Sequence, residues 1–121
     1  MNRVIHFEIP SNDVERSQQF FSNVFGWKYD KWGDMPYWMA STGEDDKPGI
    51  HGALMPKDEI AQNVVNTIGI EDAAKCRAAI EANGGQVLGE TQTVPTIGYF
   101  FYFKDPDGNL HGAMQEDPTA Q

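Results

Sequence analysis

The feature that most constrains the fold is an internal repeat. Asp13 to Gly26 spans 13 positions and Asp72 to Gly85 spans the same number, which sets an offset of 59 residues. The last strands match at an offset of 60, because residues 50–54 (IHGAL) resemble residues 110–114 (LHGAM). Self-similarity at a fixed spacing indicates two copies of one supersecondary unit. We therefore expect a single domain over residues 1–121, with internal repeats at 1–56 and 64–116.

Each repeat has the pattern of a strand, a helix and three strands. In the first repeat, residues 4–9 alternate as a strand does, and Asn12 with Glu15 has capping-box spacing before a helix over 13–25. The apolar stripe of that helix is expected to face the core. The second repeat predicts a strand over 65–70 and a helix over 72–83. The fold class is therefore α+β, built from two βαβββ modules.

Charge and cysteine content exclude several classes of partner. The chain has 9 Lys plus Arg against 18 Asp plus Glu, a net charge of −9 that repels nucleic acid and anionic membranes. Cys76 is the one cysteine, so an intrachain disulfide is excluded and a reducing compartment is expected. The N-terminus turns polar too early for a signal peptide, and no apolar stretch reaches membrane-spanning length. We expect a soluble cytoplasmic protein.

Three segments carry a resemblance to a known superfamily. They are His6-Phe7-Glu8-Ile9-Pro10, Phe25-Gly26-Trp27, and Asp105-Pro106-Asp107-Gly108-Asn109 with Met114-Gln115. With the repeat, they resemble the vicinal oxygen chelate superfamily of glyoxalase I, bleomycin-resistance proteins and extradiol dioxygenases, in its subgroup of small glyoxalase-like proteins. The resemblance implies a curved mixed sheet with a cleft and a homodimer, for which Trp27, Trp32 and Trp38 are candidate interface residues. It leaves the reaction open, because one fold hosts many functions.

The resemblance also implies where a divalent metal would bind. Its ligands lie on the first and last strand of each half, which here gives His6, Gly52, Val65 and Gly112. Only His6 has a side chain that can bind a metal, whereas catalytic zinc sites usually have three protein ligands. We therefore expect no metal cofactor of the glyoxalase type, with a divalent metal held by other ligands as the alternative.

His6 and Glu8 are the candidate catalytic residues. They lie two positions apart on one strand face, opposite the face of Ile5, Phe7 and Ile9 that should meet the helix. A carboxylate beside an imidazole raises the pKa of the histidine and can furnish an acid/base pair. The structural alternative is a His–Glu hydrogen bond on a half-polar strand.

Four further residues are candidate ligand contacts. Phe100 and Tyr102 alternate with Phe101 and Phe103, which we assign to the core, and Trp38 belongs to the surplus of aromatic residues. His51 and His111 each precede a lost metal position, so a regular strand would aim them away from the cleft. A bulge at Gly52 could restore His51, which we retain as the fourth candidate.

Three functions remain open at this point. The first is an enzyme of the lyase, isomerase or dioxygenase-related kind that uses His6 and Glu8 on a small oxygenated molecule without the standard metal. The second is a binding or sequestering protein of the bleomycin-resistance type, favoured by the aromatic residues and the acidic charge. The third is a metal-dependent lyase or dioxygenase with other ligands.

Overall fold

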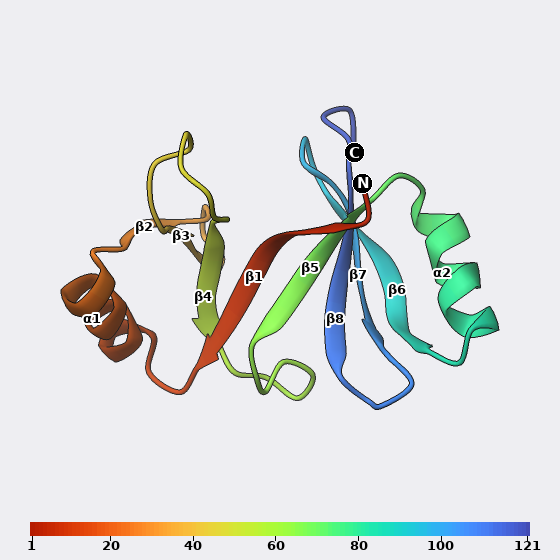
Figure 1. Cartoon of the computed structure of the whole chain (residues 1–121), viewed down its shortest axis with the longest axis horizontal. Helices are drawn as coiled ribbons and strands as arrows, with labels where there is room; N and C mark the ends of the chain where they lie inside the picture. Colours follow the sequence, from red (N-terminus) through yellow and green to blue (C-terminus); the bar gives the residue numbers. More distant parts are fainter. The chain divides into compact units, whose positions relative to one another are not determined.

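The computed structural model describes all 121 residues, and the chain falls into two compact units (Figure 1). The first unit covers residues 6–65, and the second unit covers residues 66–121 together with residues 1–5. The elements of the first half are β1 (Arg3–Ser11), α1 (Val14–Phe25), β2 (Lys28–Lys31), β3 (Trp38–Ser41) and β4 (Gly52–Pro56). Those of the second half are β5 (Val65–Ile70), α2 (Ala73–Ala82), β6 (Gln86–Val94), β7 (Gly98–Lys104) and β8 (Leu110–Glu116).

Both halves have the same sheet topology. The strand order is β2-β3-β4-β1 in the first half and β5-β8-β7-β6 in the second. The first strand of each half pairs in parallel with the last one, β1 with β4 and β5 with β8, whereas the other neighbours pair antiparallel. A parallel pair needs a long crossover connection, which here contains the helix and two strands. The predicted α+β fold of two βαβββ modules is confirmed.

Both helices begin at an aspartate with an extended backbone. Asp13 accepts a hydrogen bond from the backbone N–H of Arg16, and Asp72 accepts one from the N–H of Lys75. The two caps are 59 residues apart, as the repeat predicts. The N-cap prediction of Asn12 was wrong by one residue, because the carboxylate of Asp13 is the acceptor that reaches the third amide of the helix.

The strand register keeps the offset of 59 to the end of each half. Glu8 pairs with Ala53, and Thr67 pairs with Gly112, so both pairs span 45 positions. The offset of 60 expected for the last strands was therefore wrong, and the equivalent of Gly112 is Ala53 rather than Gly52. Pairing with the first strand decides which residues of the two halves are structurally equivalent. The shared sequence His-Gly-Ala is shifted by one residue relative to that register.

Phe7 lies on the side of the sheet that faces α1. A Cβ built at Gly52, its pairing partner, would come within 2.4 Å of the Phe7 ring. The Phe7 ring contacts Trp27 with centroids 5.6 Å apart, and Trp27 stacks on Phe21 of α1 at 4.7 Å and 10°. Since side chains alternate along a strand, the neighbouring His6 lies on the opposite face.

The two helices differ in how much of their apolar face they bury. In the second unit, the core contains Ile70, Ala73, Phe101 and Ala113, with Cys76 and Ile80 of α2 packed against it. No residue of α1 is buried, and Phe20, Val24 and Phe25 are exposed by 53%, 57% and 61%. The prediction that the whole α1 stripe faces the core was therefore wrong for these residues. Neither helix is long and apolar enough to cross a membrane.

Candidate functional site

Three side chains of the first unit form a continuous hydrogen-bond chain. The Tyr37 hydroxyl donates to Oε2 of Glu8 at 2.7 Å and lies 2.8 Å from Nε2 of His6. Because the hydroxyl proton points to Glu8, the Nε2–H of His6 donates to the Tyr37 oxygen. The planes of the two rings are 22° from parallel, and their centroids lie 6.3 Å apart. We call His6, Tyr37 and Glu8 the relay.

Burial sets the protonation of His6. Glu8 is only 5% exposed, and His6 and Tyr37 are half-buried. Desolvation by burial lowers the pKa of His6 below its ordinary value of 6.5. The expected rise in this pKa was wrong, because the carboxyl group bonds to Tyr37 in place of the ring. His6 is thus a neutral imidazole near pH 7, and its Nδ1 carries the lone pair that can accept a proton.

The turn between β2 and β3 holds Tyr37 in place. The backbone N–H of Tyr37 donates to the carbonyl of Met35, and its carbonyl accepts from the N–H of Trp32, both at 2.8 Å. Sequence analysis did not select Tyr37 as a site residue. The signal that could have found it is the aromatic hydroxyl at the start of a strand in the same half as His6 and Glu8.

The structure does not bring Trp38 to the relay. Trp38 pairs with Leu54, which pairs with Ile9, and Ile9 shares the face of Phe7. The indole therefore belongs to the opposite side of the sheet from His6 and Glu8. It lies under the ammonium group of Lys31, 5.7 Å from the ring centroid. A ligand contact by Trp38 remains a prediction.

Phe100 and Tyr102 lie next to each other on β7. Their rings meet edge to face, with centroids 4.7 Å apart and planes at 90°. Tyr102 pairs with Gly112, where a Cβ would come within 2.8 Å of the Phe100 ring. Phe101, between them, is 1% exposed and belongs to the core. The alternation predicted for β7 is confirmed, and ligand contact by Phe100 and Tyr102 remains a prediction.

His51 closes the loop that precedes β4. Its Nδ1 accepts the backbone N–H of Thr42 at 3.1 Å, and its Nε2–H donates to Asp45 at 2.7 Å. The side chains are 41% and 92% exposed, so solvent screens this pair strongly. No bulge aims His51 toward His6, and the structure does not bring it to the relay. Its ligand contact remains a prediction.

His111 stabilises the turn between β7 and β8. Its Nε2–H donates to Oδ2 of Asp105 at 2.9 Å, and its ring stacks on Phe103 at 5.2 Å. Asp105 also accepts the backbone N–H groups of Asp107 and Asn109. These hydrogen bonds, that of His111 foremost, hold the pKa of the Asp105 carboxyl group well below its ordinary range. The tight turn predicted at Asp105–Gly108 is confirmed.

The residues at the glyoxalase-type metal positions do not fit a metal centre. With the corrected register, these positions are His6, Ala53, Val65 and Gly112. Ala53 and Val65 are fully buried hydrocarbon, and a side chain at Gly112 would collide with Phe100. Nowhere in residues 1–121 do three His, Cys, Asp or Glu side chains gather as a metal site requires. A divalent ion at these positions would have a single protein ligand, His6.

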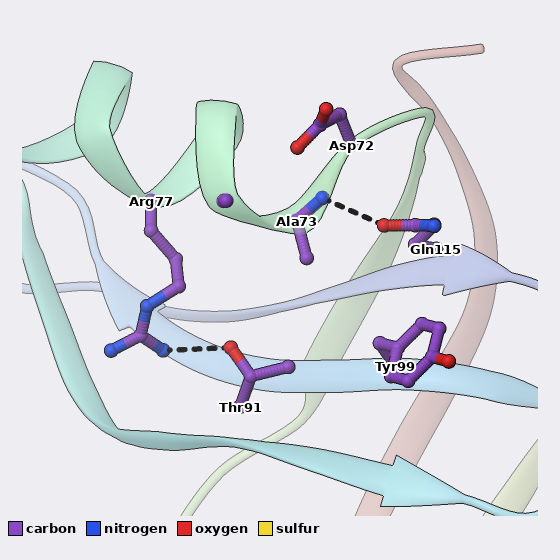
Figure 2. A pocket seen from close by; sticks show the side chains of 7 residues that line it. Asp72, Ala73, Arg77, Thr91, Tyr99 and Gln115 are labelled. Carbon is purple, nitrogen blue, oxygen red and sulfur yellow. Dashed lines mark hydrogen bonds between the residues drawn. The ribbon is translucent and has the colours of Figure 1, made fainter. Parts of the chain in front are cut away.

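An open hollow of about 650 Å³ lies where α2 begins in the second unit (Figure 2). Figure 2 shows two of its polar side chains, Arg77 and Gln115, in hydrogen bonds within the protein. The Arg77 guanidinium donates to Thr91 at 3.2 Å and to the carbonyl of Gly89 at 2.8 Å, and Gln115 accepts the N–H of Ala73. No histidine or cysteine lines the hollow. The relay is therefore the stronger candidate for chemistry.

Comparisons with known proteins give one sequence relative and several likenesses of fold. A protein of Didymella fabae, named "Glyoxylase-like domain-containing protein", is 31% identical over 110 residues, which cover 86% of each chain. A methylmalonyl-CoA epimerase solved with methylmalonyl-CoA and NH4+ superposes with a TM-score of 0.69 at 15% identity, over 100% of this chain and 99% of the other. The epimerase from Mycobacterium tuberculosis superposes with a TM-score of 0.66 at 13% identity, over 96% and 89%.

The structural likenesses support the fold that the repeat predicts. The family model matches residues 3–111, nearly the whole of both modules. The chain belongs to the Glyoxalase/Bleomycin resistance protein/Dioxygenase superfamily.

Proposed function

We propose that this protein binds a small oxygenated molecule and transfers a proton on it, with His6 as the base and Glu8 as the acid/base group behind it. The observation that carries the proposal is the relay itself, in which Tyr37 links a neutral imidazole to a carboxyl group that is 5% exposed. Burying polar groups on a strand face costs free energy that apolar residues would not cost. That cost favours a role in chemistry over a role in packing alone.

The chemistry that suits the relay is removal of a proton from carbon beside a carbonyl group. A neutral imidazole has a lone pair for this proton, and the lowered pKa of His6 keeps that lone pair available at pH 7. Return of the proton to the same or a neighbouring atom would complete an isomerisation or epimerisation. The epimerases among the structural relatives are 13% and 15% identical to this chain, and they suggest methylmalonyl-CoA as one compound to test.

A ligand screen tests binding and chemistry separately. Ligand-observed NMR in D2O would cover small 2-oxo acids, α-hydroxy aldehydes and ketones, small cationic metabolites and methylmalonyl-CoA. We expect at least one carbon acid to bind and to exchange its carbon-bound proton for deuterium. Binding without exchange would support the sequestering alternative and overturn the proposed chemistry. Variants at the predicted contacts Trp38, His51, Phe100 and Tyr102 would show which of them touch the bound probe.

We also propose that the protein forms a homodimer through the exposed face of α1. Phe20, Val24 and Phe25 expose on the order of 300 Å² of apolar surface, given the 150–250 Å² that an aromatic side chain can bury. A stable interface needs about 800 Å² per partner, so this patch would be its apolar centre inside a polar rim. A second copy is the favoured occupant because α1 has one acidic and one basic residue, Glu15 and Arg16, and is neutral in a chain of charge −9.

Trp27, Trp32 and Trp38 were the aromatic residues first expected at the interface, and of these Trp32 stays a candidate. Trp27 packs against Phe7 and Phe21 within its own unit, and Trp32 is exposed by 42%. We further propose a cytoplasmic location, because Cys76 is a free thiol whose pKa is raised by burial, as in a structural cysteine of a reducing compartment.

A further inference from the structure

We propose that Tyr37 is a positioning residue that holds His6 in its Nε2–H tautomer and so makes Nδ1 the nitrogen that receives the proton of the substrate. This inference rests on the proposed function, but its geometric part can be measured on the free protein. It assigns a role to a residue that the sequence patterns did not single out.

The direction of the hydrogen bonds carries the inference. A tyrosine has one hydroxyl proton, and Glu8 accepts it at 2.7 Å. Toward Nε2 of His6, 2.8 Å away, the Tyr37 oxygen is then the acceptor. Because a neutral imidazole has one N–H, a proton on Nε2 leaves the lone pair on Nδ1. Glu8 thereby sets the tautomer of a ring to which it is joined through Tyr37.

The backbone keeps this arrangement in register. Two hydrogen bonds of 2.8 Å fix the peptide groups of Tyr37 to Met35 and Trp32. His6 and Glu8 lie two residues apart on β1, so both face the same side as the hydroxyl. The Tyr37 oxygen lies 2.8 Å from Nε2 of His6, which is hydrogen-bond distance.

The proposed proton transfer balances without a further reactant. The C–H bond of the substrate breaks, its electron pair moves toward the adjacent carbonyl oxygen, and the proton forms a bond to Nδ1 of His6. The Nε2 proton passes to the oxygen of Tyr37 as the hydroxyl proton passes to Oε2 of Glu8. The ring and the phenol end neutral, the carboxyl group holds the proton, and the reverse transfer returns it to the product.

Ring ¹⁵N shifts of His6 in the ligand-free protein test the tautomer directly. Wild type should show the Nε2–H form. In Glu8→Leu the Tyr37 hydroxyl has lost this acceptor and can donate to Nε2, so the ratio of the Nε2–H to the Nδ1–H form should fall by roughly tenfold, the size of one net hydrogen bond. Tyr37→Phe should expose the Nε2–H proton to rapid exchange with water. Tyr29→Phe is the matched control, because it removes a hydroxyl bonded to the carbonyl of Gln18 in the same unit.

The outcomes separate this inference from the proposed function. Unchanged ¹⁵N shifts in folded Glu8→Leu, or unchanged exchange of the Nε2–H proton in Tyr37→Phe should the first variant not fold, would overturn the positioning role. The expected shifts in a protein that exchanges no carbon-bound proton would support the positioning role and overturn the proton-transfer chemistry. If Tyr29→Phe and Tyr37→Phe change the ¹⁵N shifts of His6 and the exchange of its Nε2–H proton equally, the unit has loosened as a whole, which would also overturn the positioning role.

Discussion

Replacing Gly52 with alanine should destabilise the protein by about 1–3 kcal/mol, the usual cost of forcing a methyl group into a packed site. A Cβ at Gly52 would lie 2.4–2.5 Å from three atoms of the Phe7 ring, whereas carbon atoms pack at about 3.5–4.0 Å. The Phe7 ring has little room to retreat, because it contacts Trp27, which stacks on Phe21. The penalty is therefore steric and comes from one ring.

Urea unfolding followed by tryptophan fluorescence would measure the change, as the shift in midpoint at a common m-value. Gly43→Ala is the matched control, because no atom lies within 4 Å of its Cβ position, and it should be neutral or stabilising by up to about 1 kcal/mol. Adding Phe7→Leu to Gly52→Ala should recover part of the loss, because it removes the ring that collides. If both alanine variants unfold like wild type, Phe7 does not lie against Gly52, and the placement of His6 on the opposite face loses its support.

Three further perturbations have defined outcomes. The folded-state pKa of His6 lies below 6.5, so its contribution to stability should be complete above about pH 6.5 and fall as the pH drops toward that lower pKa. The thermal unfolding temperature of His6→Gln should therefore depend less on pH than that of wild type, and an equally steep dependence would count against the buried neutral imidazole. After dialysis against a chelator, elemental analysis should find far less than about one Ni, Zn or Mn per chain, because a single imidazole holds a hydrated ion weakly, and the metal content of His6→Ala should be the same. A full equivalent of metal that is lost in the variant would revive the metal-dependent alternative. Phe20→Ser with Phe25→Ser should convert the dimer to a monomer in sedimentation, whereas a wild-type monomer at micromolar concentration would refute the α1 interface.

The architecture was accessible from the sequence because local signals and the repeat agree. Asp13 and Asp72 cap their helices 59 residues apart, as the repeat predicts, although the capping-box spacing placed the first cap one residue early at Asn12. Gly26 ends α1 in a left-handed conformation, as predicted. The alternation of β7 sends Phe101 to the core and Phe100 to the other face. These features depend on residues close in sequence, where periodicity and capping chemistry act directly.

The misplaced details depend on pairing between distant strands. Alignment of the two repeats by residue type equated Gly52 with Gly112, but the parallel pairing of β1 with β4 makes Ala53 the structural equivalent of Gly112. The hydroxyl that joins His6 to Glu8 comes from Tyr37, 29 residues beyond Glu8, and no local pattern indicates that this hydroxyl reaches β1. Contacts at such separation follow from strand order and turn geometry, which a single sequence does not specify.

The rate of deuterium exchange into a bound carbon acid tests the central claim most directly. For a probe that the screen identifies, wild type and Tyr29→Phe should exchange the carbon-bound proton at the same rate. His6→Gln should be slower by at least about 100-fold, the lower end of what general acid–base catalysis contributes. Exchange that persists undiminished in folded His6→Gln, or its absence in wild type with every bound probe, would contradict a proton-transfer role for the relay.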